Sequence, residues 1–277
     1  MSSIASLRKV GAEHTWLYGS QRPDEMEIHR LELSATFGFP IFSNPDTPLL
    51  VTPGFAWNWL EGPLSAGADD ADGWPDMPPR LYDAYLDFGW FPRISDCFSL
   101  NLGFRPGVWS DFKNTGSGSV RFLGRGEGVI RFSPMCDLHL GVWYLDRNKI
   151  KLLPAFGVHW RPNTEWDNYL VFPNPKVRKR FVNVGTSQWW WYVAGEYGGG
   201  RWTVERHDVQ LAALDPMVDY PGPAFSDDID YNDLRVIFGL EWETQTQAHG
   251  HLEVGYVWGR EIIYAGTQRP PSLSLKD

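Results

Sequence analysis

The sequence predicts an all-β fold, and within that class an antiparallel up-and-down transmembrane β-barrel of about 12 strands, within a range of roughly 10–14. Three observations predict it: apolar side chains recur at every second position, the alternating stretches are long, and Trp and Tyr gather near their ends. In residues 233–243, for example, Leu234 and Phe238 fall on one face of a strand, whereas Arg235 and Glu241 fall on the other.

The same alternation recurs along most of the chain, interrupted by turns rich in Pro, Asn, Asp and Gly. It predicts strands over residues 28–39, 49–60, 80–91, 97–110, 120–132, 137–146, 150–160, 168–173, 176–182, 188–197, 201–205, 233–243 and 250–264. Short predicted connections, such as 92–96 and the glycine turn 198–200, alternate with long ones, such as 61–79, 111–119 and 207–231. Barrels of the outer-membrane type have short turns on one side and long loops on the other.

The chain has 277 residues and no shift in composition that would divide it. We therefore expect one barrel domain over residues 26–265, after a partly irregular segment, 1–25. The tail, 266–277, is interpreted as a free end or as the start of an incomplete last strand. Residues 1–8 lack the apolar core of a signal peptide, which taken alone favours the cytoplasm; the alternative is a trimmed chain.

Composition excludes several classes of protein. Mean hydropathy is −0.34 and no run approaches the ~20 apolar residues of a spanning helix, which excludes a helical membrane protein but not a barrel with a polar lumen. The net charge of −9 argues against a nucleic-acid partner. The one basic cluster, residues 176–180, is interpreted as a solvated loop or as a contact to anionic headgroups.

The two cysteines do not form a disulfide framework. Cys97 and Cys136 begin predicted strands that lie two apart in a simple meander, which separates them by roughly 10 Å. That distance is too long for a disulfide bond. We expect two free thiols.

Alternation alone fits two structures, because a soluble β-sandwich buries the apolar face that a membrane barrel exposes. Three features favour the membrane barrel: strands longer than the usual ~5–6 residues, aromatic residues near strand ends, and a polar face with Arg and carboxylates but little Lys. The aromatic residues assigned to the girdles are Trp57, Trp59, Trp90, Trp109, Trp160, Trp189, Trp242 and Trp258.

Charged residues on the polar faces are the candidates for a lumen site. They are Asp83, Asp87, Arg105, Arg121, Arg125, Glu127, Arg131, Glu196, Arg235 and Glu241. Asp83 and Asp87 are four residues apart on one face, or ~13 Å, which is too far for the paired carboxylates of a glycosidase. We expect them to pair with Arg105, or with Arg121, Arg125 and Arg131, across the lumen.

Five stretches carry a resemblance to a known family. They are PRISDCFSLNLGFRPGVWSDF (92–112), LLPAFGVHWRP (152–162), AGEYGGGRWTVE (194–205), DLRVIFGLEW (233–242) and GHLEVGYVWGRE (250–261). The chain resembles, over about residues 26–265, the bacterial outer-membrane β-barrel proteins catalogued only as a domain of unknown function. The resemblance implies an outer-membrane barrel and no assigned activity. It also implies a cleaved signal peptide and a strand beyond Asp277, neither of which this sequence contains.

Catalytic and cofactor motifs are not found in the sequence: it has no nucleophile elbow, no HExxH and no phosphate-binding loop. His139 and His159 share the polar face of adjacent predicted strands, so a metal site or a His–carboxylate pair there is an alternative to plain lumen filling. With the loop 61–79, they are the only hints of a membrane-bound hydrolase. We therefore predict no cofactor and lean against an enzyme.

The sequence as a whole predicts a structural protein or small-solute channel of the bacterial outer membrane. Its expected partners are outer-membrane lipid and small polar solutes, filtered by a charged, salt-bridged lumen. The alternative is a soluble β-sandwich that binds carbohydrate or acts as a hydrolase, since exposed Trp rings can stack on sugars.

Overall fold

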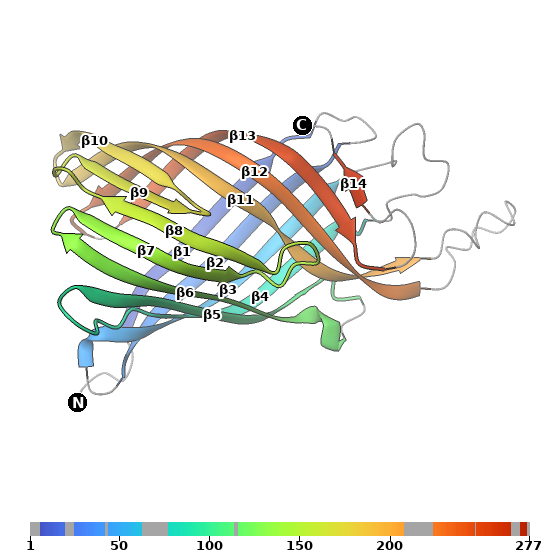
Figure 1. The fold of residues 1–277 in the computed structure, drawn as a ribbon. Coiled ribbons are helices and arrows are strands. Elements are labelled where there is room, and N and C mark those ends of the chain that lie inside the picture. The colour runs from blue at the N-terminus through green and yellow to red at the C-terminus, as the bar shows by residue number, and fades with distance from the viewer. Residues whose placement is uncertain are drawn as a thin grey trace, which may run out of the picture.

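The protein is described by a computed structural model that covers residues 6–19, 25–41, 44–62, 77–113, 116–207, 224–246, 248–266 and 272–275. These residues form fourteen β-strands in one sheet and one short 3-10 turn, Ser117–Ser119, so the all-β prediction is confirmed. The sheet is curled into a barrel (Figure 1). Within the covered ranges, no helix has the length and apolar character needed to span a membrane.

The strands follow one another around the sheet in chain order. They are β1 (Ser6–Leu17), β2 (Glu27–Ile41), β3 (Asn44–Glu61), β4 (Arg80–Trp90), β5 (Phe98–Ser110), β6 (Val120–Ser133), β7 (Cys136–Tyr144), β8 (Leu152–Trp160), β9 (Trp166–Phe172), β10 (Lys176–Val184), β11 (Ser187–His207), β12 (Ala224–Thr244), β13 (His249–Tyr264) and β14 (Ser272–Ser274). Each strand pairs antiparallel with the next. Every predicted strand overlaps an observed one.

Three parts of the chain differ from expectation. β1 lies in the segment 1–25, which was expected to be partly irregular, and most of its residues are exposed on both faces. Within the expected loop 207–231, β12 already begins at Ala224, and residues 208–223 lie outside the described residues. Most of the loop 61–79 lies outside them too.

The glycines 198–200 form a bend within β11 and not the turn that the sequence predicted. β11 pairs with β12 on both sides of them. Gly199 has a φ of +96°, and a Cβ atom there would lie 1.9 Å from the carbonyl oxygen of Tyr231, so only glycine fits. Beside the bend, β12 shifts register against β13 between Asn232 and Leu234.

Beyond this bend, the distal parts of three strands form what we call the mouth sheet. It consists of residues 200–207 of β11, 224–233 of β12 and 260–264 of β13. Thr203 of the mouth sheet pairs with Ser110 of β5, so the pairings close a ring of seven strands, β5 to β11. The consecutive residues Asp230 and Tyr231 are 0% and 5% exposed, so both faces of the mouth sheet are covered.

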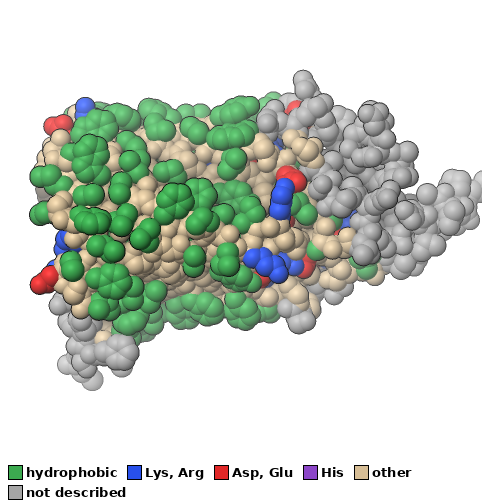
Figure 2. Space-filling model, viewed as in Figure 1, with side chains coloured by type: hydrophobic (Ala, Val, Ile, Leu, Met, Phe, Trp, Pro, Cys, Tyr) green, Lys and Arg blue, Asp and Glu red, His purple; other side chains and the backbone are tan. Residues whose placement is uncertain are grey.

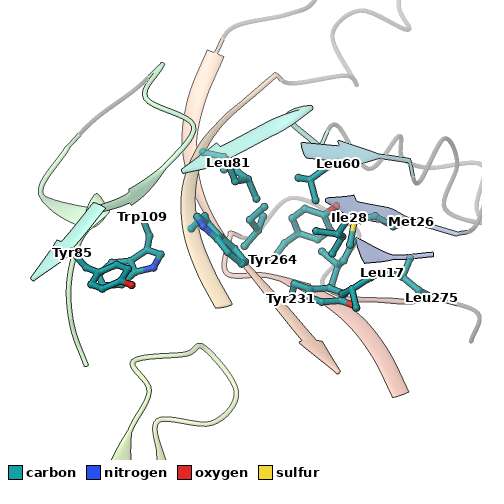
Figure 3. Close-up of a cluster of buried hydrophobic side chains, with 14 residues drawn as sticks. Leu17, Met26, Ile28, Leu60, Leu81, Tyr85, Trp109, Tyr231, Tyr264 and Leu275 are labelled. Carbon is teal, nitrogen blue, oxygen red and sulfur yellow. The ribbon is translucent and has the colours of Figure 1, made fainter. Parts of the chain in front are cut away.

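The buried apolar cluster lies at this mouth (Figure 3). Its members are Leu17, Met26, Ile28, Leu60, Leu81, Tyr85, Trp109, Trp202, Val204, Ile229, Tyr231, Ile262, Tyr264 and Leu275. The mouth sheet supplies six of them, Trp202, Val204, Ile229, Tyr231, Ile262 and Tyr264, and strands β1 to β5 supply most of the rest. Trp109 belongs to this cluster and is 7% exposed, so its assignment to an aromatic girdle was wrong.

The outer wall of the barrel is apolar. Figure 2 shows hydrophobic side chains spread over the wall, with charged side chains gathered toward the two ends. Outward residues of central strands, such as Phe104, Phe122, Leu140 and Phe156, are about half exposed. Both cysteines have free thiols, as predicted.

Candidate functional site

The ten predicted lumen residues do not form one cluster in the structure. They are distributed over several groups of ion pairs and hydrogen bonds, each group linking two or more strands. Most of these side chains are buried or half-buried. The apolar residues of the same strands lie on the outer face of the barrel. The candidate site is therefore the barrel interior, and it is best described one group at a time.

Asp83 of β4 is held by three neighbours. Its carboxylate accepts hydrogen bonds from Arg30 Nη1 at 2.5 Å, Asn58 Nδ2 at 3.1 Å and the Trp202 Nε1 of the mouth sheet at 2.6 Å. Asp83 is 3% exposed. We expected Asp83 to pair with Arg105 or an arginine of β6, and that prediction was wrong, because β2 brings Arg30 closer.

Asp87 pairs with Arg105, as the sequence predicted. The Arg105 Nη2 and Nε atoms lie 2.5 Å and 2.7 Å from Asp87 Oδ2. The guanidinium also lies over the Tyr85 ring, with 4.4 Å between its central carbon and the ring centroid. Tyr85 donates its hydroxyl hydrogen bond to Glu32 of β2 at 2.5 Å. This group therefore joins β2, β4 and β5 across the barrel interior.

Glu127 of β6 is 2% exposed and fully surrounded by donors. Trp143 Nε1 donates to it at 2.6 Å and Asn101 Nδ2 at 3.3 Å, while His139 Nδ1 lies 3.3 Å from it. Such compensation is what a carboxylate removed from water requires. Arg125 lies two residues away on the same face, and its side chain crosses Gly103. A Cβ atom on Gly103 would lie 2.7 Å from the Arg125 side chain.

The two histidines predicted to share a face lie side by side, with 6.4 Å between ring centroids. His159 Nε2 lies 2.5 Å from Asp167 Oδ1, and Arg178 Nη2 donates to the same carboxylate at 2.9 Å. Among the residues that the structure describes, no three His, Cys, Asp or Glu side chains are grouped as metal ligands would be. Each histidine lies beside a carboxylate, His139 beside Glu127 and His159 beside Asp167, so the expected His–carboxylate contacts are present.

Arg121 joins β6 to the mouth sheet. Its Nη2 atom donates to Asp228 at 2.7 Å and to the Thr203 hydroxyl at 2.9 Å. Arg201 Nη2 donates to the other oxygen of Asp228 at 2.6 Å. Two arginines therefore share one carboxylate at the mouth, and Arg121 is only 4% exposed.

Arg147, in the turn between β7 and β8, is a second attachment of the mouth sheet, and sequence analysis missed it. It donates to the carbonyl oxygens of Gly198 and Gly199 at 2.8 Å and 2.9 Å, and to Asn232 Oδ1 at 2.8 Å. Its guanidinium lies over the Tyr197 ring. In the sequence, Arg147 lies in an ordinary polar turn. Its role depends on the bend at residues 198–200, which turns the carbonyl groups of Gly198 and Gly199 toward Arg147.

The remaining predicted residues lie in three further groups, which contain four pairs. Arg235 binds Asp233 with its Nε atom at 2.8 Å, and Glu196 lies 3.4 Å from Arg235 Nη1. Glu241 accepts from Lys176 at 2.6 Å. Other pairs lie near the short turns, where Arg131 Nε is 3.5 Å from Asp137 Oδ1.

The basic cluster 176–180 is strand β10 and not a solvated loop. Lys176 and Arg178 point to the interior, where both contact Glu241. Lys179 lies over the Trp166 ring at 5.1 Å. The interpretation was wrong because β10 does not alternate regularly. A bulge between Arg180 and Val182 places neighbouring apolar residues on the same face of the strand.

The comparisons with known proteins add no relative: no family model matches the chain, and neither curated proteins nor solved structures gave a match. The candidate site is therefore defined by its own geometry. That geometry is a set of compensated charges inside a barrel, with the mouth sheet and the apolar cluster at one end.

Proposed function

We propose that the protein is a β-barrel of the bacterial outer membrane whose charged interior is a narrow passage for small polar solutes, closed at one mouth in the conformation described. The observation that carries the proposal is the distribution of side chains: apolar residues cover the outer wall, and ion pairs fill the interior. Membrane barrels have this distribution, because lipid contacts the outside and water or polar groups fill the lumen.

The outer wall supports a membrane location on energetic grounds. Soluble monomers rarely expose continuous apolar surface over more than a few hundred Å². Here apolar side chains extend over neighbouring strands, from Phe104 and Phe122 on β5 and β6 to Val236 and Phe238 on β12. A soluble carbohydrate-binding sandwich would need these side chains inside, so this distribution favours the membrane barrel over that alternative.

The orientation follows from the connections. Residues 61–79 and 207–224 join strands at the end that carries the mouth sheet, and short turns such as 133–136 lie at the opposite end. Outer-membrane barrels place short turns in the periplasm and long loops outside the cell. The mouth sheet would therefore close the external side.

The interior favours small solutes over large ones. Asp83, Arg121 and Glu127 are each less than 5% exposed, so paired side chains occupy much of the lumen. Alternating positive and negative groups along such a passage filter solutes by charge and size. Opening would require movement of the mouth sheet, which Arg121 and Arg147 attach to β6 and to the β7–β8 turn.

The test is conductance of the purified protein in planar bilayers. Arg105→Ala with Arg178→Ala leaves Asp87, Asp167 and their neighbours without cations, so the reversal potential in a KCl gradient should shift toward cation selectivity. Arg93→Ala is the matched control, because Arg93 is exposed in a turn and its ion pair within the described residues is with Asp96, at 3.4 Å. Unchanged conductance and selectivity in the double variant would contradict the channel proposal.

A further inference from the structure

The two ends of the sheet leave a seam in the barrel wall. β1 pairs with β2 along its length, and no described strand pairs with its other edge. β13 pairs with β12 over nearly its whole length, but on its other edge β14 covers only Glu261–Ile263. Leu275 N also donates to the Arg260 carbonyl oxygen at 2.9 Å. The edge of β13 over residues 249–259 and the edge of β1 over residues 6–17 are therefore both unpaired within the described residues.

Exposure of side chains marks the same seam. Leu252, Val254 and Tyr256 of β13 are 70%, 70% and 63% exposed, whereas the outward residues of the neighbouring strand β12 are 42–50% exposed. A strand with a neighbour on each side shows the lower values, so β13 lacks a neighbour here. Residues 251–256 are all exposed, including those that face the interior, as expected for an open edge.

The seam is held together only near the mouth. Arg260 of β13 donates hydrogen bonds to the carbonyl oxygens of Tyr18, at 3.4 Å, and of Met26, both in the connection after β1. Leu275, just after β14, and Leu17 of β1 belong to one buried cluster. Farther from the mouth, the described residues include no such link between β1 and β13.

Strand direction determines what fits the seam. Because successive strands are antiparallel, β1 and β13 run in the same direction, and one strand antiparallel to both would complete the pairing. β14 already pairs antiparallel with this edge of β13 at the mouth. A single inserted strand separates its neighbours by about 10 Å, twice the ~4.8 Å strand spacing.

We propose that the seam between β1 and β13 is a docking site for one extended peptide strand that continues the line of β14 and is antiparallel to both edges. The occupant has an apolar residue at every second position, so that apolar side chains join the outer wall and polar ones the lumen. About ten residues span the wall. The bilayer setting rests on the proposed function. There, unpaired backbone groups at both edges are strongly unfavourable because lipid offers no hydrogen-bond partner, and the docked strand pairs them.

The experiment uses cysteine variants of the full chain in detergent, made in a background where the free thiols Cys97 and Cys136 are replaced by Ser. Ala12→Cys and Val254→Cys report on the two edges, and Val142→Cys is the matched control, since Val142 is 52% exposed on β7 but β7 is paired on both sides. The probe is a synthetic ten-residue peptide of alternating Val and Thr with a central bromoacetamide group. A peptide with Pro at alternate positions, which cannot donate the ladder hydrogen bonds, is the control probe.

We expect the Val–Thr peptide to label Ala12→Cys and Val254→Cys about tenfold faster than Val142→Cys, because a docked peptide raises the local concentration of the reactive group. The proline peptide should show no such preference. Equal labelling of all three variants would overturn the proposal. So would a direct disulfide in the Ala12→Cys/Val254→Cys double variant, since that bond requires Cα atoms within about 7 Å. A chain found soluble without detergent would contradict the membrane location alone, and the labelling result would still decide the seam.

Discussion

The Tyr192 ring of β11 lies flat across Gly239 of β12. A Cβ atom on Gly239 would lie 2.1 Å from Tyr192 Cζ, and the Tyr192 hydroxyl reaches past the glycine to donate to Glu253 on β13. The arrangement recurs on β2, β3 and β4, where Tyr85 crosses Gly54 and donates to Glu32. In both places a glycine in the middle strand lets a tyrosine link the two outer strands through the lumen.

A side chain at Gly239 should displace the Tyr192 ring. We expect Gly239→Val to lower the free energy of unfolding by about 1–3 kcal/mol, the usual cost of overpacking, with loss of the contact to Glu253. The free energy is measured by urea unfolding of the protein in lipid vesicles. Gly126→Val is the matched control, since its Cβ meets only a Leu102 methyl group at 4.0 Å. Equal losses in the two variants would contradict this account of the glycine.

The bend at Gly199 should depend on glycine for a different reason. Gly199→Ala places a side chain at φ +96° and against the Tyr231 carbonyl oxygen, so we expect a loss of about 2 kcal/mol or more. Gly124→Ala is the control within a regular strand, because its Cβ would meet only an ordinary contact of 3.5 Å. Thermal melts followed by circular dichroism measure both. Stability of Gly199→Ala equal to that of Gly124→Ala would show that the bend tolerates a side chain.

Arg147 should hold the mouth sheet in place. Arg147→Ala removes the donor for three oxygens, and leaving buried acceptors unsatisfied costs about 1–3 kcal/mol each. We expect the mouth sheet to be cleaved by protease faster than in the unchanged protein, with the rest of the barrel intact, and single-channel conductance to rise. Lys149→Ala is the control, because Lys149 lies two residues away and forms an exposed ion pair with Glu261. It should change neither the rate of proteolysis nor the conductance. Unaltered proteolysis in Arg147→Ala would rule out its attachment role.

A charged side chain on the outer wall should cost more folding free energy the deeper it lies in the bilayer. Val236→Arg, in the middle of β12, is expected to cost about 2–4 kcal/mol in folding into a bilayer, because arginine is unfavourable at the midplane. Phe132→Arg, beside the short turn at 133–136, should cost about 0–1 kcal/mol although Phe132 is 69% exposed. Folding yields in lipid vesicles at increasing urea give both values. Equal costs at the two positions would mean that depth in a bilayer has no influence.

The sequence allowed the barrel wall to be predicted because its signal is local: alternation over ten residues shows which side chains share a face. It predicted the Asp87–Arg105 pair, where both residues lie on neighbouring strands. It failed for Asp83, whose partners Arg30 and Trp202 come from distant parts of the chain. Contacts across a barrel depend on its shear and closure, which no local pattern encodes.

The mouth sheet could not be predicted for a related reason. Its residues are buried on both faces. Over residues 227–233 only Ile229 and Tyr231 alternate with polar residues, which is too short a run to predict a strand. The sequence Gly198–Gly200 has the composition of a turn, and only the pairing of β11 with β12 on both sides shows it to be a bend. The contacts of Tyr85 with Gly54 and of Tyr192 with Gly239 do have a signal in the sequence. In each case a Gly and a Tyr lie on neighbouring predicted strands, and a search for such pairs would find them.

The central claim is that this barrel exposes its apolar face to lipid, and a heat-modifiability gel of the membrane fraction tests it most directly. The chain, expressed behind a signal peptide, should be released from membranes only by detergent, and its band should shift in mobility on boiling, as expected for a folded barrel that resists dodecyl sulfate. Protein that stays in the soluble fraction without detergent and shows no shift on boiling would contradict the claim.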